Sequence, residues 1–251
     1  MDFSLSRRIN RPSYTDLNPV RWYSDQYFYY SGNPDLIPEL AWIYSLNYSL
    51  KNKYIFSAIY NRSLNFINRK LSIDDNGITI KSQSDNFGNR HRFDFTVSTP
   101  FKVFPFWDIL FFSDISYTTY PISEFSGEKQ LSKWATTLML QQDISLPKEY
   151  KINLSAHWFS SELLGIYSSQ PTGYVDFGIK KTFFKKKLVT QLTISDIFNT
   201  NRYKAHSLSE IIDYSYDDKP DSRRVGFTLL YHLGGNLVKE KNGKTDEQKR
   251  L

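Results

Sequence analysis

The sequence contains no cysteine among its 251 residues. This absence excludes a disulfide scaffold, a thiolate metal site and a cysteine nucleophile. The sequence also lacks any run of about 18 or more apolar residues, which excludes a transmembrane helix. The mean hydropathy of −0.50 is compatible with a membrane β-barrel, because only alternate residues of its strands contact lipid.

Aromatic residues are abundant, with 19 Phe, 18 Tyr and 5 Trp. The net charge is +6, and its densest parts are the run Lys185–Lys187 and the segment 239–250. Basic turns and a solvated tail explain these clusters better than a nucleic-acid-binding surface does. We therefore expect no nucleic-acid partner.

The segment Lys133–Ser161 shows the repeating unit of the chain, two alternating strands joined by the short reversal Pro147–Glu149. Both arms are longer than the usual strand of about five or six residues. Aromatic residues lie near the ends of the apolar face, as in transmembrane strands of about 9–11 residues. That face consists of Trp134, Thr136, Leu138, Leu140, Ile144 and Leu146 on the first arm, and Tyr150, Ile152, Leu154, Ala156 and Trp158 on the second.

Ten segments follow this pattern: 2–8, 40–50, 54–64, 89–100, 107–120, 133–146, 150–162, 173–184, 188–200 and 223–233. Their connections alternate between short (51–53, 101–106, 147–149, 185–187) and long (9–39, 65–88, 121–132, 163–172, 201–222). Short periplasmic turns and long external loops are typical of bacterial barrels. The sequence thus predicts an all-β fold, the antiparallel portion of a transmembrane β-barrel in the cell outer membrane, over residues 1–235. A polar, disordered periplasmic tail is predicted over 236–251.

Two short sequence motifs lie at the two ends of the proline-rich segment between the first two strands: RPSYTDLNP at Arg11–Pro19 and GNPDLIPE at Gly32–Glu39. They resemble the strand-loop-strand signature of the TonB-dependent outer-membrane receptors of the Bacteroidetes type, in the outer-membrane β-barrel family. Ile194–Thr200 and the last strand, Arg224–Leu233, resemble the same family. His232 and Leu233, however, stand where that family typically has Arg or Lys and Phe.

The resemblance implies a plug domain and a barrel of about 22 strands, of which this chain is the carboxy-terminal ten. The first residues, MDFSLSRRINRPSY, contain neither an apolar h-region nor a small-residue cleavage site. We therefore expect a piece of a longer protein, with its plug and TonB box before Met1. Because the first segment has only about seven residues, direct pairing with the last one is not expected, and the ten-stranded sheet should stay open.

The expected function is that of a barrel-wall segment in uptake of a nutrient ligand, such as a glycan, a peptide or a metal chelate. Its expected partners are outer-membrane lipid, the missing plug and strands, and a surface lipoprotein. One alternative is an autonomous ten-stranded outer-membrane protein. Another is a soluble β-rich sugar-binding module, whose apolar faces would pack against each other.

Aromatic residues of the first long loop are the candidates for ligand contact, since exposed rings can stack on sugars or peptides. The simpler interpretation is that they pack the loop onto the barrel rim. These candidates are Tyr14, Trp22, Tyr23, Tyr27, Phe28, Tyr29 and Tyr30.

No combination of residues indicates a catalytic or metal site. The histidines are dispersed, with His157 and His232 on polar strand faces and His91 and His206 near loops, and none has metal-ligand spacing. Polar barrel walls commonly carry carboxylates, so Asp108, Asp114, Asp143 and Asp176 are expected to line the lumen. We expect no metal, no cofactor and no enzymatic activity.

Overall fold

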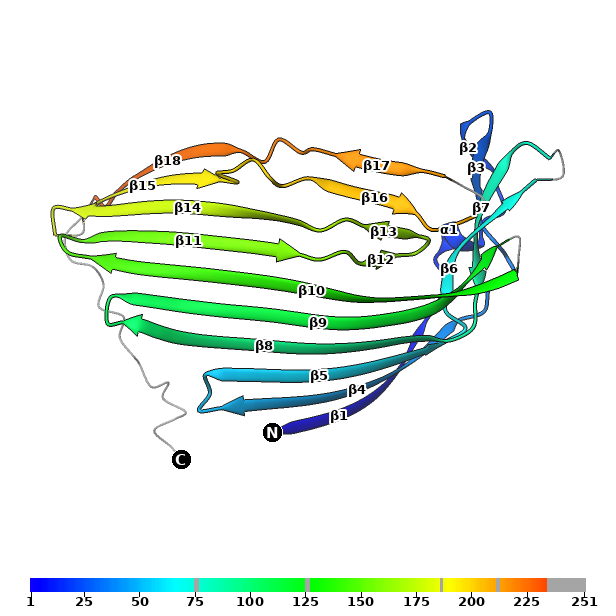
Figure 1. Ribbon diagram of the computed structural model, residues 1–251, viewed down its shortest axis with the longest axis horizontal. Helices are drawn as coiled ribbons and strands as arrows, with labels where there is room; N and C mark the ends of the chain where they lie inside the picture. The colour runs from blue at the N-terminus through cyan, green and yellow to red at the C-terminus, as the bar shows by residue number, and fades with distance from the viewer. Residues whose placement is uncertain (75–76, 125–126, 186, 211–212, 234–251) are drawn as a thin grey trace.

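The computed structural model describes all residues except 75–76, 125–126, 186, 211–212 and 234–251. The described chain is almost entirely β-structure (Figure 1). Its one described helix is the single turn α1 (Tyr14–Leu17). Within these residues no helix has the length and apolar character needed to cross a bilayer.

A ten-stranded antiparallel sheet, the main sheet, forms most of the molecule (Figure 1). Each strand pairs with the next one in this order, so the sheet is a simple up-and-down meander. In sheet order the strands are β1 (Asp2–Asn10), β4 (Glu39–Leu50), β5 (Tyr54–Leu64), β8 (Arg90–Phe104), β9 (Trp107–Glu124), β10 (Gly127–Leu146), β11 (Tyr150–Phe159), β14 (Thr172–Phe183), β15 (Leu188–Ser195) and β18 (Arg224–Tyr231).

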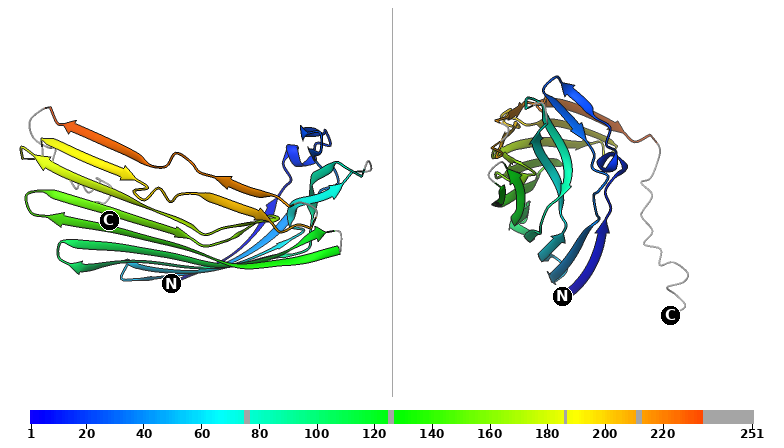
Figure 2. Two further views of the ribbon diagram at one scale, coloured as in Figure 1. Left: turned by 45° about the horizontal axis from the view of Figure 1, so that its top comes forward. Right: turned by 90° about the vertical axis from the view of Figure 1, so that its right-hand side faces the viewer.

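All ten predicted strands are present in the main sheet. The sheet curves into an open trough, with β1 and β18 at its two edges (Figure 2). Within the described part of the chain these two strands do not pair with each other. The expected open sheet is therefore the one observed.

The short connections lie together at one end of the main sheet, here called the turn end. The connections 51–53 and 147–149 are three-residue hairpin loops, which use residues of positive φ to reverse the chain. Lys51 and Asn52 have φ of 54° and 49°, and Lys148 and Glu149 have φ of 59° and 62°. The predicted turn at 101–106 is shorter than expected, because β8 continues to Phe104 and β9 begins at Trp107.

The opposite end, the loop end, is more ordered than the predicted long loops. Two four-stranded sheets form there (Figure 1). The first cap sheet consists of β2 (Trp22–Asp25), β3 (Phe28–Ser31), β7 (Ile80–Asn86) and β6 (Ile67–Ile73). The second cap sheet consists of β12 (Leu163–Leu164), β13 (Tyr167–Ser169), β16 (Tyr203–Ser207) and β17 (Ser215–Asp218). Of the hairpin tip predicted at Asp75–Gly77, Asp75 and Asn76 lie outside the described residues.

The prediction of a polar loop at 121–132 is wrong. β9 and β10, of 18 and 20 residues, pair continuously from Trp107 and Ile144 up to Glu124 and Gly127. The reason is burial, because Ile122 is 0% exposed. It belongs to a hydrophobic cluster that joins this hairpin to both cap sheets and consists of Phe66, Leu71, Tyr120, Ile122, Leu131 and Ile166. We call the two cap sheets and this extended hairpin the cap.

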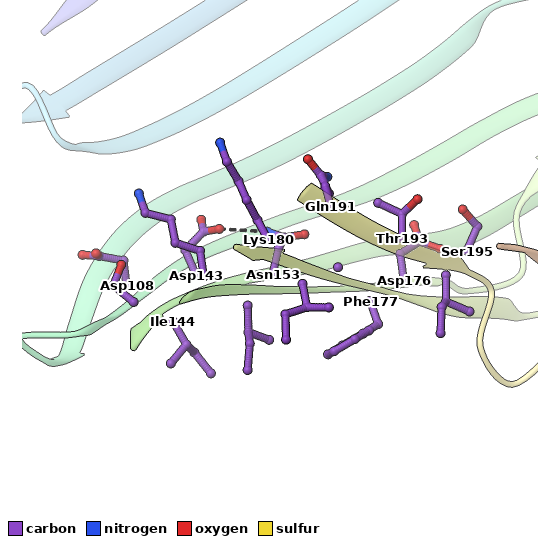
Figure 3. Close-up of a pocket in the computed structure, with 16 residues that line it drawn as sticks. Asp108, Asp143, Ile144, Asn153, Asp176, Phe177, Lys180, Gln191, Thr193 and Ser195 are labelled. Carbon is purple, nitrogen blue, oxygen red and sulfur yellow. Dashed lines mark hydrogen bonds between the residues drawn. The ribbon is translucent and has the colours of Figure 1, made fainter. Parts of the chain in front are cut away.

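The two faces of the main sheet differ in polarity, as the alternation predicts. Figure 3 shows Lys180, Gln191 and Thr193 on the inner side of the curve, whereas Ile144 and Phe177 point away from it. The outer face carries large exposed apolar side chains on every part of the sheet. Among them are Phe3, Leu5, Phe93, Phe95, Ile115, Trp134, Trp158, Val225, Phe227 and Leu229.

Five aromatic side chains and Leu5 form a row over the outer face of β1, β4, β5, β8, β9 and β10, and we call it the aromatic row. The strand register sets its members directly opposite one another: Leu5, Tyr44, Tyr60, Phe93, Tyr117 and Trp134. The rings of Tyr60 and Phe93 stack with centroids 4.5 Å apart, and those of Tyr117 and Trp134 lie 5.0 Å apart. Phe104, Phe106 and Trp107 form a second aromatic group at the turn end. Aromatic girdles on both sides of an apolar band mark the two membrane interfaces of a transmembrane barrel.

Candidate functional site

The structure separates the seven loop aromatics into two groups. Tyr29 is 1% exposed, and Phe28 packs against the hydrophobic cluster of the cap. These two side chains therefore pack within the loop-end structure. The other five are exposed, with Tyr14 on α1 and the rest on β2, on β3 or in the turn between them: Tyr14, Trp22, Tyr23, Tyr27 and Tyr30. Their role in ligand contact remains a prediction.

The two sequence motifs at the ends of the first long loop, Arg11–Pro19 and Gly32–Glu39, pack against each other. The backbone N–H of Gly32 donates to the carbonyl of Asn18 at 2.8 Å, and that of Asn33 donates to the carbonyl of Asp16 at 2.6 Å. A Cβ atom at Gly32 would lie 2.5 Å from the Asn18 carbonyl oxygen and 2.6 Å from that of Asp16. Only glycine permits this close approach of the two backbones. The two motifs therefore form one structural unit.

Asp16 fastens this unit to the first cap sheet. Its carboxylate accepts a hydrogen bond from the Ser13 backbone N–H, and its own backbone N–H donates to the Ser13 hydroxyl oxygen, which together form a capping box at α1. The Ser13 hydroxyl also donates to the carboxylate. It also accepts a hydrogen bond from the Ser84 hydroxyl at 2.8 Å. The bond from the Ser13 side chain is the largest influence, and although burial opposes it, the pKa of Asp16 is held below its ordinary value.

An ion pair with a buried carboxylate joins β4 and β8 at the loop end of the main sheet. The Arg90 Nη2 lies 3.3 Å from the Glu39 carboxylate, and the Glu39 side chain is 5% exposed. The same nitrogen donates to the Ser63 hydroxyl at 3.2 Å, and the guanidinium lies 4.4 Å from the centre of the Phe66 ring. Sequence reasoning did not identify this pair, because its partners are about fifty residues apart.

Asp196 organises the loop that follows β15. The residue is 1% exposed and has a φ of 46°. Donors surround its carboxylate: the Thr200 N–H at 2.8 Å, the Asn201 N–H at 3.0 Å, the Ser222 hydroxyl at 2.6 Å and the Lys219 ammonium at 3.8 Å. Burial alone raises its pKa, but the hydrogen bonds and the Lys219 charge outweigh burial and lower the pKa to about 2.

Asp196 makes the order of its loop depend on pH. A carboxyl whose pKa falls from 3.8 to about 2 on folding contributes about 2 kcal/mol, fully present above about pH 4 and lost as the pH falls through about 2. Hydrogen exchange of the Thr200 and Asn201 amides, corrected for intrinsic rates, should show this loss of protection. Asp196→Asn should exchange faster at neutral pH and lack the acid step. An identical acid step in the variant would contradict the assignment.

A hollow of about 660 Å³, lined by both polar and apolar residues, lies over β9, β10, β11, β14 and β15 (Figure 3). Asp108 pairs with Lys102 at 3.1 Å, and Asp143 accepts a hydrogen bond from the Asn153 amide at 2.8 Å. Asp176 accepts one from the backbone N–H of Asp196. These carboxylates, and Asp114 on the same face, line the concave side as predicted and are engaged by the fold.

A row of three ring side chains and a methionine runs across the inner face. Phe112, Met139, His157 and Tyr174 lie opposite one another on β9, β10, β11 and β14. The rings of His157 and Tyr174 stack with centroids 4.7 Å apart. Met139 is 36% exposed. The row was not predicted, although the apolar residues at inner-face parity in β9 and β10 were a visible signal.

The histidines are dispersed in the part of the chain that the structure describes. Among the described residues no group of three or more His, Asp or Glu side chains is placed to hold a metal ion. His91 lies on β8 and contacts the Tyr60 hydroxyl at 2.8 Å through Nδ1. His206 lies on β16, away from the other histidines.

An antiparallel meander with an apolar outer face, aromatic girdles and a polar inner face is the wall of a transmembrane β-barrel. The outer membrane protein beta-barrel family matches this chain over residues 1–231. The chain belongs to that family, and it is located in the cell outer membrane in contact with lipid. No curated protein matches it. The soluble sugar-binding alternative is therefore set aside.

Proposed function

We propose that the chain is a barrel-wall segment of a TonB-dependent receptor-like protein that takes up a nutrient ligand. The observation that carries the proposal is the open trough, whose edge strands β1 and β18 each have one neighbour among the described residues. Unpaired strand edges require a partner, and in a lipid bilayer the requirement is stricter because no water satisfies the backbone. Further strands of the same protein would pair with these edges.

The aromatic and Met residues of the inner-face row support a plug inside the completed barrel. Met139 is 36% exposed on the concave face, where a plug could pack against it. This plug would carry the TonB box through which the inner-membrane machinery acts. We propose no enzymatic role, because the inner-face carboxylates are already engaged by the fold.

The cap is the proposed external surface for the ligand and for a surface lipoprotein. The five exposed loop aromatics lie there, and long loops face the exterior in bacterial barrels. The nutrient remains one of the three classes considered, a glycan, a peptide or a metal chelate.

Cells in which this chain is targeted alone to the outer membrane should not accumulate a nutrient against a gradient. The energy-coupling plug is missing from such cells, so at most passive leakage is expected. Uptake of radiolabelled nutrients, with and without a protonophore, measures the difference. Protonophore-sensitive accumulation would contradict the proposal.

Cysteine crosslinking separates an open wall from an autonomous ten-stranded barrel. Leu5→Cys with Leu229→Cys should not form an intramolecular disulfide in membranes, nor should neighbouring outer-face pairs of β1 and β18. Leu5→Cys with Tyr44→Cys is the matched positive control, because these positions are register partners. The chain has no native cysteine to interfere. Efficient β1–β18 crosslinking would show a closed barrel and reject the open wall.

A further inference from the structure

A row of basic and aromatic side chains follows the aromatic row on the outer face, one step toward the loop end. The strand register places Arg7 opposite Trp42, Trp42 opposite Arg62, and Arg62 opposite His91. The step is two residues along each strand, or about 7 Å. These side chains therefore lie just beyond the girdle at that interface.

Both arginines in this row lack a carboxylate partner. Arg7 and Arg62 are exposed, and in the described structure neither forms an ion pair. The Arg7 guanidinium lies 5.4 Å from the centre of the Trp42 ring. This cation–π contact orients Arg7 but leaves its charge uncompensated.

The position of this row relative to the membrane identifies which molecule can neutralise the charges of Arg7 and Arg62. A cation on the lipid face is costly within the hydrocarbon and tolerated near the interface. The aromatic row marks that interface, and the loop end is the external side, so Arg7 and Arg62 lie at the level of the outer-leaflet headgroups. The neighbouring surface is the lipid-facing band, which makes lipid the molecule adjacent to the two charges.

We propose that Arg7, Trp42 and Arg62 form a binding site for the phosphorylated headgroup of an outer-leaflet lipid. Arg7 and Arg62 are separated by two strand spacings, about 10 Å, so their long side chains can converge on one headgroup. Guanidinium groups bind phosphate oxygens through paired hydrogen bonds. Trp42 lies between them with a half-buried indole that packs beside the headgroup. This site does not depend on the proposed uptake function.

The test measures lipid binding by the full chain purified in neutral detergent. Native mass spectrometry compares phosphorylated lipid A with the same lipid after removal of its phosphates. We expect the phosphorylated form to bind at least tenfold more tightly. The double variant Arg7→Gln with Arg62→Gln should lose this preference, and Arg62→Gln alone should lose part of it.

Arg8→Gln is the matched control. Arg8 is the next residue on the same strand and equally exposed, but its side chain belongs to the inner face. This variant should keep the preference for phosphorylated lipid, and circular dichroism should show that all variants are folded. The proposal is overturned if Arg8→Gln has the same effect, if both lipids bind equally, or if inorganic phosphate alone binds as tightly as the lipid.

Discussion

Gly32→Ala is expected to open the first loop of the cap while leaving the main sheet intact. Three backbone atoms of Asp16 and Asn18 lie 2.5–2.6 Å from the position of the new Cβ. Backbone atoms cannot move aside as a flexible side chain can, so we expect a local cost of about 3 kcal/mol. Tryptic cleavage after Arg21 should accelerate about 100-fold, since cleavage follows the population of the open form.

Gly88→Ala is the control for this experiment. A Cβ at Gly88 would meet only the Pro121 side chain at 3.4 Å, an ordinary contact. Its cleavage rate should therefore stay close to that of the unmodified chain. If Gly32→Ala is cleaved no faster than Gly88→Ala, the close packing of the two sequence motifs does not stabilise the cap.

Arg90→Ala is expected to lower the stability of the folded chain by about 3–5 kcal/mol, because it leaves the buried Glu39 carboxylate without its partner. Thermal or urea unfolding in detergent measures the change. Replacing both residues together, with Arg90→Met and Glu39→Leu, should restore much of the loss because no buried charge then remains.

The exposed ion pair Lys102–Asp108 is the control for the stability loss expected on removing Arg90. Its side chains are 61% and 52% exposed, and exposed pairs contribute only about 0–1 kcal/mol. Lys102→Ala should therefore unfold close to the unmodified chain. If Arg90→Ala and Lys102→Ala lower the folding stability equally, burial of the Glu39 carboxylate does not determine the size of the loss.

The ten strands of the main sheet were predictable because each one repeats a two-residue period whose apolar side meets lipid. This pattern is local, so it can be read from each segment without knowing which strands lie beside it. The order of the sheet was equally accessible, since a meander pairs each strand with the next. The alternation of short and long connections also predicted which end carries the ordered loops.

The cap was not predictable in the same way. β3 pairs in parallel with β7, and β13 pairs with β16, across separations of about 50 and 40 residues. No local period encodes such contacts. Proline cannot donate to a sheet, yet Pro121 lies within β9, where burial of Ile122 and Leu131 in the cluster favours the extended hairpin.

The loop aromatics show the same limit at the level of single residues. Tyr29 and Tyr30 are adjacent and chemically identical, but one is buried and the other is 44% exposed. Their strand alternates between two faces, and only the tertiary structure decides which face is covered. The sequence identified the set of rings but could not assign each ring to packing or to solvent.

The length of β9 and β10 has a mechanical consequence. A strand of 20 residues extends for about 65 Å, more than twice the apolar band of about 25 Å that it crosses. The same two strands therefore belong to the membrane wall and to the centre of the cap, with no hinge between them. We expect the cap to move with the wall as a single rigid body, so it cannot swing aside as a lid. Under the proposed uptake function, a ligand would then pass by movement inside the completed barrel and not by opening of the cap.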